Sequence, residues 1–189
     1  MFQNIQSLSA ETKIELVKTA ISILSLVTVI VGGIFAFIQW KRSQALKRAD
    51  YINELNEKMR DDSALQDFVY MIDYGKSWYS KEFHKGGELE KNVDKSLAYF
   101  SYVCYLKEEK IINDKEFQFF EYRINRILQN WQIRDYFYNL YHFSKKFNVP
   151  FTFDFLFQYG KKKGMFEKDF FDNTTYKKPL SQYHRNISF

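Results

Sequence analysis

The stretch around Asp73 brings together the residue types that acid–base chemistry uses. It reads Ile72-Asp-Tyr-Gly-Lys-Ser-Trp-Tyr79, is followed by His84, and lies where a predicted helix gives way to a loop. A carboxylate and an imidazole that reach one substrate can act as general acid and base. The candidate pocket of a hydrolase or nuclease therefore consists of Asp73, Trp78, His84 and Glu121. The alternative is a polar network that only ties the helix ends together.

Both carboxylates of this candidate pocket fall on predicted apolar helix faces. Glu121 lies between Phe120 and Ile124, and Asp73 lies one turn beyond Val69. Burying an unpaired carboxylate is costly, so we expect a basic or hydroxyl partner for Glu121.

The sequence contains no familiar catalytic or metal-binding pattern. Its three histidines lie far apart, and none is spaced with a second ligand as a zinc pair requires. There is neither a glycine-rich phosphate loop nor a Gly-x-Ser-x-Gly turn. The one cysteine, Cys104, lies in an apolar stretch and is expected to be a small buried residue. The sequence thus predicts no metal or cofactor and leaves enzymatic activity open, with a non-enzymatic role favoured.

One segment has the length and composition of a membrane span. From Thr19 to Trp40 the chain runs for 22 residues without a charged side chain. As a helix this run is about 33 Å long, against about 30 Å for the hydrocarbon core of a bilayer. The charges before it cancel, whereas a cleaved signal peptide has a basic start and a shorter apolar part. We therefore expect a retained single-pass transmembrane helix.

Basic residues beside this span predict its orientation. Four of them follow it, with no acidic residue before Asp50: Lys41, Arg42, Lys47 and Arg48. Because basic flanks stay on the cytoplasmic side, the N-terminus is predicted outside and the C-terminal part inside. The predicted segments are a short extracytoplasmic part at 1–18, the transmembrane helix at 19–40, a cytoplasmic α-helical domain at 41–163 and a basic aromatic tail at 164–189.

Small residues recur along one face of the span. Thr28, Gly32 and Ala36 are spaced by four and therefore share a helix face. Small residues at this spacing let two helices approach closely, which suggests a homodimer. The alternative is that small residues are simply common in membrane spans.

The rest of the chain is predicted to be all-α. It has few breakers, since the whole chain has two prolines and seven glycines, and its apolar residues recur every three or four positions. The transmembrane helix is expected to continue into a stalk, followed by a compact, aromatic-rich bundle of about five helices. Capping residues mark two starts, at Asp61-Asp62-Ser63 and at Asn113 with Glu116. The predicted helices after the stalk begin near 63, 93, 113, 133 and 151, and the main loop covers 80–91.

The C-terminal part is basic. Residues 141–189 carry nine basic and four acidic side chains, and the basic residues include Lys161, Lys162 and Lys163 close to phenylalanines. On a tethered domain these lysines could contact anionic lipid headgroups. Nucleic-acid binding is a competing and less favoured hypothesis. A plain solvated surface is the third possibility.

The layout of the chain resembles that of known proteins. The span with Gln39-Trp-Lys-Arg-Ser43, and the later stretches Tyr99–Leu106, Ile111-Ile112 and Phe119–Ile124, look like uncharacterised bacterial families of small single-pass membrane-anchored α-helical proteins. The resemblance implies a bacterial inner-membrane protein, and some members of such families lie near phage-defence genes. It implies no catalytic residues.

Three functional hypotheses follow from these patterns. The first is a cytoplasmic module, anchored in the membrane, that binds another protein or itself, in bacterial stress or phage-defence signalling. The second is a hydrolase or nuclease with a pocket near Asp73 and His84. The third is an effector that perturbs the membrane through its span.

Overall fold

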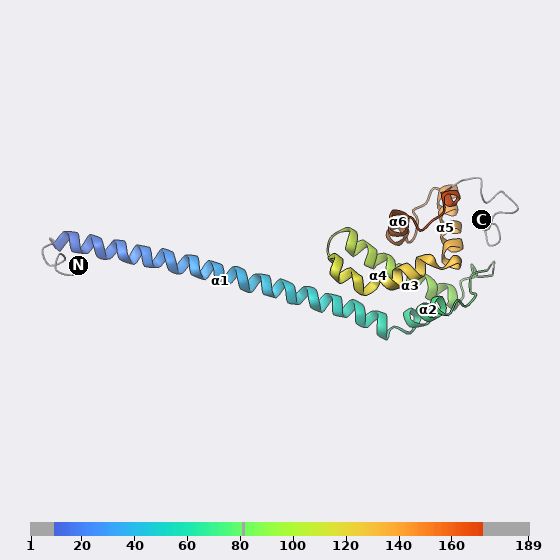
Figure 1. The fold of residues 1–189 in the computed structure, drawn as a ribbon, viewed down its shortest axis with the longest axis horizontal. Coiled ribbons are helices and arrows are strands. Elements are labelled where there is room, and N and C mark those ends of the chain that lie inside the picture. The colour runs from blue at the N-terminus through green and yellow to red at the C-terminus, as the bar shows by residue number, and fades with distance from the viewer. Residues whose placement is uncertain (1–9, 81, 172–189) are drawn as a thin grey trace. The chain divides into compact units, whose positions relative to one another are not determined.

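The computed structural model of the protein describes residues 10–80 and 82–171 and shows an all-helical fold (Figure 1). No strand occurs in these two ranges. The predicted all-α fold class is therefore confirmed. The helices are α1 Ala10–Asp61, α2 Ser63–Asp73, α3 Glu88–Glu108, α4 Asp114–Gln129, α5 Trp131–Phe147 and α6 Asp154–Lys162, followed by a 3₁₀ turn at Lys168–Phe171.

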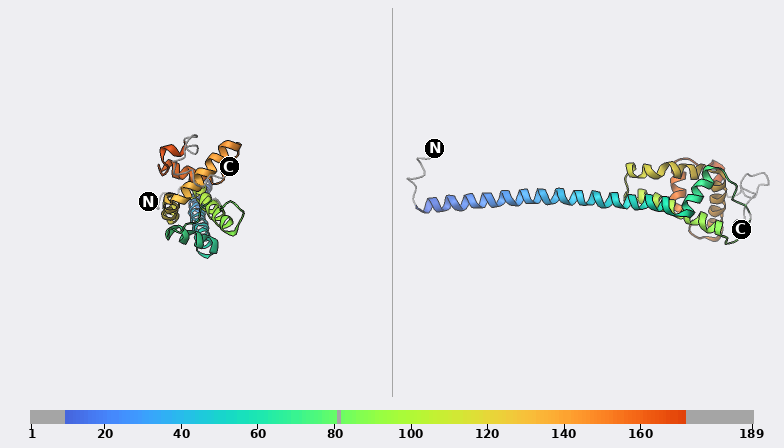
Figure 2. Two further views of the ribbon diagram at one scale, coloured as in Figure 1. Left: turned by 90° about the vertical axis from the view of Figure 1, so that its right-hand side faces the viewer. Right: turned by 90° about the horizontal axis from the view of Figure 1, so that it is seen from below.

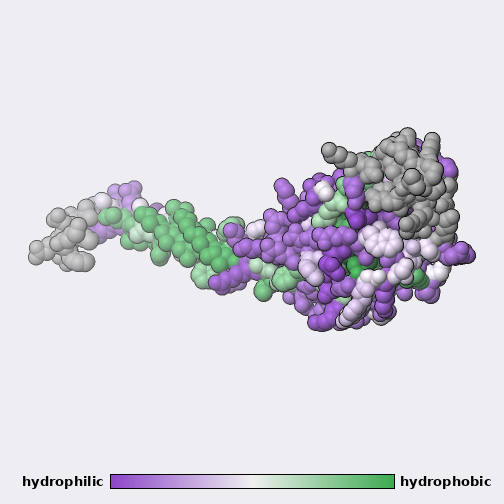
Figure 3. Space-filling model, turned by 45° about the vertical axis from the view of Figure 1, so that its right-hand side comes forward, coloured by the Kyte–Doolittle hydropathy of each residue, from purple (hydrophilic) through white to green (hydrophobic). Residues whose placement is uncertain are grey.

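The chain forms two units, which divide between Asn53 and Glu54. In the first unit, α1 runs without a break from Ala10, as predicted for a span that continues into a stalk. Its apolar side chains are exposed and form a continuous hydrophobic surface (Figure 3). The hydroxyls of Thr19 and Thr28 donate to the carbonyl oxygens four residues earlier, each over 2.9 Å, which leaves few polar groups facing outward. By length and composition, this one helix of the described residues could cross a membrane.

The second unit is a bundle built around α3 and α4. Helix α3 packs against α2, α4 and α6, and α4 also packs against α2, α5 and α6 (Figure 2). The fully buried core residues of these two helices are mainly large: Leu97, Phe100, Phe117, Phe120, Ile124 and Leu128. Cys104 is buried among them, as predicted.

Capping explains where α2 and α4 begin. The Asp62 carboxylate accepts hydrogen bonds from the backbone N–H groups of Ala64 and Leu65, at 3.0 and 3.4 Å. Asn113 and Glu116 form the predicted capping box, in which each side chain accepts from the backbone of the other. Both predicted caps are confirmed.

Helix α3 begins earlier than the sequence indicated. It starts at Glu88, not near Val93, because an extended Gly87 precedes it and the Glu90 carboxylate accepts from the Gly86 N–H at 2.6 Å. The first turn contains acidic residues, which suit the positive end of a helix but add little to the apolar pattern. The loop before α3 is consequently 74–87.

Helix α5 is covered partly by segments outside the α-helices. On one side lie rings of the loop 74–87, and on the other lie Phe151 and Phe153, which precede α6, and Phe166 and Phe170, which follow it. Phe170 is fully buried, so the described part of the predicted tail, up to residue 171, packs on the bundle. The rest of the predicted tail, 172–189, lies outside the described residues.

Gly160 allows α6 to approach its neighbours closely. A Cβ atom at this position would lie 2.9 Å from the ring of Phe166 and 3.2 Å from the Leu128 side chain. The Phe166 ring is itself packed against Phe157, with ring centroids 5.0 Å apart, so it cannot simply move away.

We expect Gly160→Ala to lower the free energy of unfolding of the detergent-solubilised protein by about 1 kcal/mol. Overpacking costs about 1–3 kcal/mol, and the better helix propensity of alanine offsets about 1 kcal/mol of it. Denaturant unfolding measures the change. The matched comparison is the same substitution in a Phe166→Leu background, where the loss should shrink; an equal loss in both backgrounds would contradict this account.

Candidate interaction surface

Trp78 and His84 meet in an aromatic cluster between the loop 74–87 and α5. The ring of Phe83 lies 5.1 Å from that of Trp78, and the ring of Tyr79 lies 5.6 Å from that of His84, measured between centroids. Tyr136 of α5 contacts all four of these rings. Two of the four predicted pocket residues therefore lie in one cluster.

A polar network runs through this cluster. The Tyr79 hydroxyl lies 3.2 Å from His84 Nε2 and accepts a hydrogen bond from the Asn139 amide at 2.9 Å. On the other side of the imidazole, His84 Nδ1 lies 3.5 Å from the Glu90 carboxylate. Both imidazole nitrogens thus face protein groups, and Tyr79 is only 3% exposed.

Burial shapes the acid–base properties of this network. Desolvation raises the pKa of Tyr79 above its ordinary value, and the hydrogen bond from Asn139 partly opposes the rise. Desolvation also raises the pKa of Asp94, although the Tyr136 hydroxyl donates to its carboxylate at 2.7 Å and opposes the shift. Tyr79 and Tyr136 therefore stay neutral and hydrogen-bonded. The network ties the loop 74–87 to α3 and α5, which agrees with the alternative interpretation of a polar network that ties the helix ends together.

Gln132 holds the loop against α5, a role that the sequence analysis missed. Its Oε1 accepts from the N–H groups of Trp78 and Tyr79 at 2.6 and 2.9 Å, and its Nε2 donates to the Lys76 carbonyl at 2.8 Å. The side chain is fully buried. The signal was a glutamine one turn before Tyr136, on the same face of a strongly apolar helix.

Among the described residues, no contact joins Asp73 to this cluster. Its carboxylate accepts from Arg126 Nε of α4 at 3.3 Å, and both side chains are partly exposed. Asp73 also lines a hollow of about 340 Å³ between the last turn of α1, α2 and α4.

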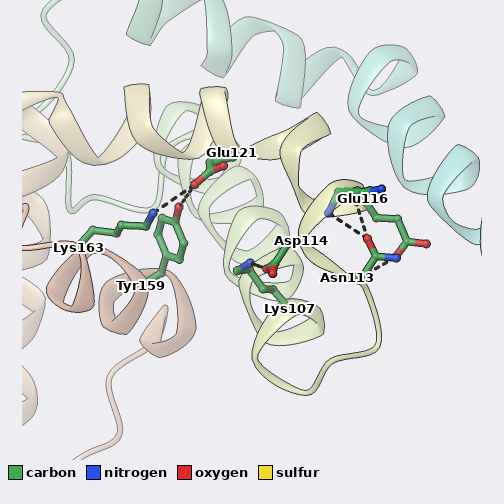
Figure 4. A network of polar contacts seen from close by, with 8 residues as sticks. Lys107, Asn113, Asp114, Glu116, Glu121, Tyr159 and Lys163 are labelled. Atoms are coloured by element: carbon green, nitrogen blue, oxygen red, sulfur yellow. Dashed lines mark hydrogen bonds and ion pairs between the residues drawn. The ribbon is translucent and has the colours of Figure 1, made fainter.

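Glu121 binds α6, and the predicted partner is confirmed. Its carboxylate accepts from the Tyr159 hydroxyl at 2.9 Å and from Lys163 Nζ at 3.4 Å, and all three side chains point toward one another (Figure 4). Burial and the neighbouring carboxylate together raise the pKa of Tyr159.

The described contacts therefore do not gather the four predicted residues into one pocket. Trp78 and His84 share a cluster, while Asp73 pairs with α4 and Glu121 with α6. Spacing along the chain placed Asp73 near His84, but the Arg126 guanidinium draws the Asp73 carboxylate toward α4.

The three predicted lipid-contacting lysines are mostly engaged within the bundle. Lys162 pairs with Glu108 at 2.6 Å, Lys163 pairs with Glu121, and the Lys161 ammonium lies 5.0 Å from the centre of the Phe171 ring. Lys162 and Lys163 also line a hollow of about 410 Å³ between α3 and α6 that reaches Cys104. Burial raises the pKa of that thiol to about 12, so it stays protonated and unreactive near neutral pH.

The predicted dimer face lies on the exposed part of α1. Thr28 and Gly32 line a shallow hollow with Val27, Val31 and Phe35, while Ala36 follows one turn later. Self-association through this face stays a prediction.

Exposed aromatic side chains gather on α2 and α4. Tyr70 and Tyr74 are 57% and 74% exposed, and their rings stack with centroids 6.0 Å apart. Phe119 and Tyr122 are 62% and 68% exposed and lie one turn before Arg123 and Arg126, the two arginines of α4 that face α2. We call these residues the α2–α4 surface: Tyr70, Tyr74, Phe119, Tyr122 and Arg123.

Comparisons with known proteins identify no relative of the chain. No protein family, curated protein or solved structure matches the chain. Within the described residues, no group of three or more histidine, cysteine, aspartate or glutamate side chains could hold a metal ion.

We expect Gln132→Ala to destabilise the bundle by about 3 kcal/mol, because it leaves buried backbone groups of the loop without partners. Exposed Gln129 is the matched control, since its replacement by alanine should change the denaturation midpoint little. Thermal or denaturant unfolding of the solubilised protein measures both. Equal midpoints for the two variants would contradict the role given to Gln132.

Proposed function

We propose that the protein is a membrane-anchored helical module that binds another protein through its α2–α4 surface. The observation that carries this proposal is the concentration of exposed tyrosine, phenylalanine and arginine on two adjacent helices. These residue types are enriched in protein interfaces, where rigid aromatic side chains and arginine contribute most of the binding energy. The rest of the bundle uses its aromatic side chains mainly inside the core.

The structure gives the catalytic hypothesis less support than this one. Both ring nitrogens of His84 lie against protein groups. The two carboxylates predicted to share its pocket, Asp73 and Glu121, bind other residues. A general acid or base must reach a substrate, and here both imidazole nitrogens already face protein groups although the side chain is 22% exposed.

A membrane anchor fits the same function. Helix α1 exposes an apolar stretch long enough to cross a bilayer, and no described residue of its own unit covers it. The basic flank from Lys41 to Arg48 and the resemblance in layout support a bacterial inner membrane with the bundle in the cytoplasm. Such a module holds its partner at the membrane, which suits a role in stress or phage-defence signalling.

We expect the protein to stay in the membrane fraction after a carbonate wash, with the bundle inside the cell. Exposed Gln118 can be replaced by cysteine, because the native Cys104 is buried and its raised pKa, about 12, keeps it from competing for label. An impermeant maleimide should label Gln118→Cys only after spheroplasts are lysed. Labelling of intact spheroplasts would reverse the orientation, and release by carbonate would remove the anchor.

The interaction itself can be tested by site-specific photo-crosslinking in native membranes. A photoreactive residue at Tyr74 or Tyr122 should give one discrete protein adduct. Tyr102, 46% exposed on α3, is the control position and should give none. Adducts of equal yield from all three positions, or no protein adduct from Tyr74 and Tyr122, would refute the proposed function.

A further inference from the structure

The hollow beside the α2–α4 surface contains an arginine, Arg123, that has no partner among the residues the structure describes. Its volume is about 340 Å³ and its lining comes from three helix segments. Met59 and Val69 supply apolar surface, and Tyr70 supplies an exposed ring. Arg123 reaches the hollow from α4.

The charges around the hollow are unevenly satisfied. Arg126 is paired with Asp73, and Arg60 is paired with its neighbour Asp61 at 3.0 Å. Arg123, in contrast, makes no hydrogen bond or ion pair within the described ranges, although its side chain is half-buried. A partly desolvated guanidinium that lacks an anion is an unfavourable arrangement for the free protein.

We propose that this hollow binds a carboxylate side chain of an acidic, partly apolar segment of a partner protein. This inference rests on the proposed function and names the chemistry of the partner. The planar guanidinium of Arg123 presents two parallel N–H donors, which match the two oxygens of a carboxylate. Gln66, at the same hollow, adds an amide that can bind the backbone of the segment.

The aromatic rim predicts which residues flank that carboxylate. Tyr70 lines the hollow and its ring stacks with that of Tyr74, while Phe119 lies one helical turn from Arg123. In the proposed complex, apolar residues next to the acidic residue bury area of these rings and exclude water from the ion pair. A desolvated, bidentate pair is stronger than a pair in open solvent.

The charge of the surroundings distinguishes this occupant from others. Residues 172–189 of the chain carry three basic and one acidic side chains, so they complement Arg123 poorly. A lipid surface favours clusters of lysine and arginine on a flat face, whereas here a single arginine, with no partner among the described residues, lies in a hollow. A protruding carboxylate fits this geometry.

The test repeats the Tyr74 crosslinking with variants of Arg123. Arg123→Gln should lower the yield of the protein adduct roughly tenfold, which corresponds to losing one charge-assisted hydrogen-bonding pair. Arg123→Glu should lower it further, and Arg123→Lys should retain part of it because the charge remains without the fork. Exposed Lys115, on the same helix, is the charge control, and Lys115→Glu should leave the yield unchanged.

A direct probe gives a second readout on the full chain in nanodiscs of neutral lipid. A fluorescent peptide of alternating glutamate and leucine should bind the native protein, and Arg123→Gln should weaken it roughly tenfold. The matching peptide of alternating glutamine and leucine should bind the native protein no more tightly than it binds Arg123→Gln. Because Arg123 makes no internal bond in the described residues, Arg123→Gln should also unfold at or above the native midpoint, which separates lost binding from lost folding.

The outcomes separate the two proposals. No protein adduct from Tyr74 and Tyr122 in the native chain overturns the proposed function itself. A native adduct that persists in Arg123→Glu overturns only the docking proposal. An adduct with lipid alone identifies a membrane surface as the occupant and also overturns the docking proposal. An adduct with a second copy of the chain that survives Arg123→Glu overturns the docking proposal as well.

Discussion

The bundle depends on how α5 is covered. This helix has large side chains around most of its circumference, yet only α4 among the other helices packs against it extensively. Helix α6 adds the Phe157 ring, and much of the remaining cover comes from irregular chain, whose backbone polar groups must be hydrogen-bonded once they leave water. Gln132 meets this requirement on one side, where it binds three backbone groups of the loop 74–87. On the other side, rings such as Phe166 and Phe170 bury themselves against α5 and α6.

Ion pairs also help to position the helices of the bundle. Several pairs in the bundle link different helices, as Lys95 links α3 to the cap of α2 and Lys163 links α6 to α4. These pairs are partly exposed, so each contributes about 1 kcal/mol or less, and their main effect is to fix which helix faces meet. Arg123 departs from this pattern, because it is half-buried and lines a hollow yet has no ion-pair partner among the described residues.

Local patterns predicted much of the fold because they act over one or two helical turns. The caps at Asp62 and Asn113 and the apolar stripe of α4 could be read directly from spacing. The start of α3 could not, because acidic residues at Glu88 and Glu90 stabilise a helix end without any apolar repeat.

The site was harder to predict than the fold, because it depends on contacts across long sequence separations. The partner of Glu121 was predicted in kind, since an apolar stripe with one carboxylate demands a donor. Its identity, Tyr159, was not, and neither was the pairing of Asp73 with Arg126, 53 residues away. Gln132 went unnoticed because a single amide on an apolar face carries no motif.

The placement of the three tryptophans has an optical consequence. Trp78 is 6% exposed and surrounded by rings, Trp131 is 52% exposed at the start of α5, and Trp40 is 58% exposed near the end of the apolar stretch of α1. Indole emission shifts to longer wavelength as water gains access, so the three fluorophores report separately on the core, the bundle surface and the apolar stretch of α1. Single-tryptophan versions of this chain would therefore show whether the loop, the bundle or α1 responds first to a change in conditions.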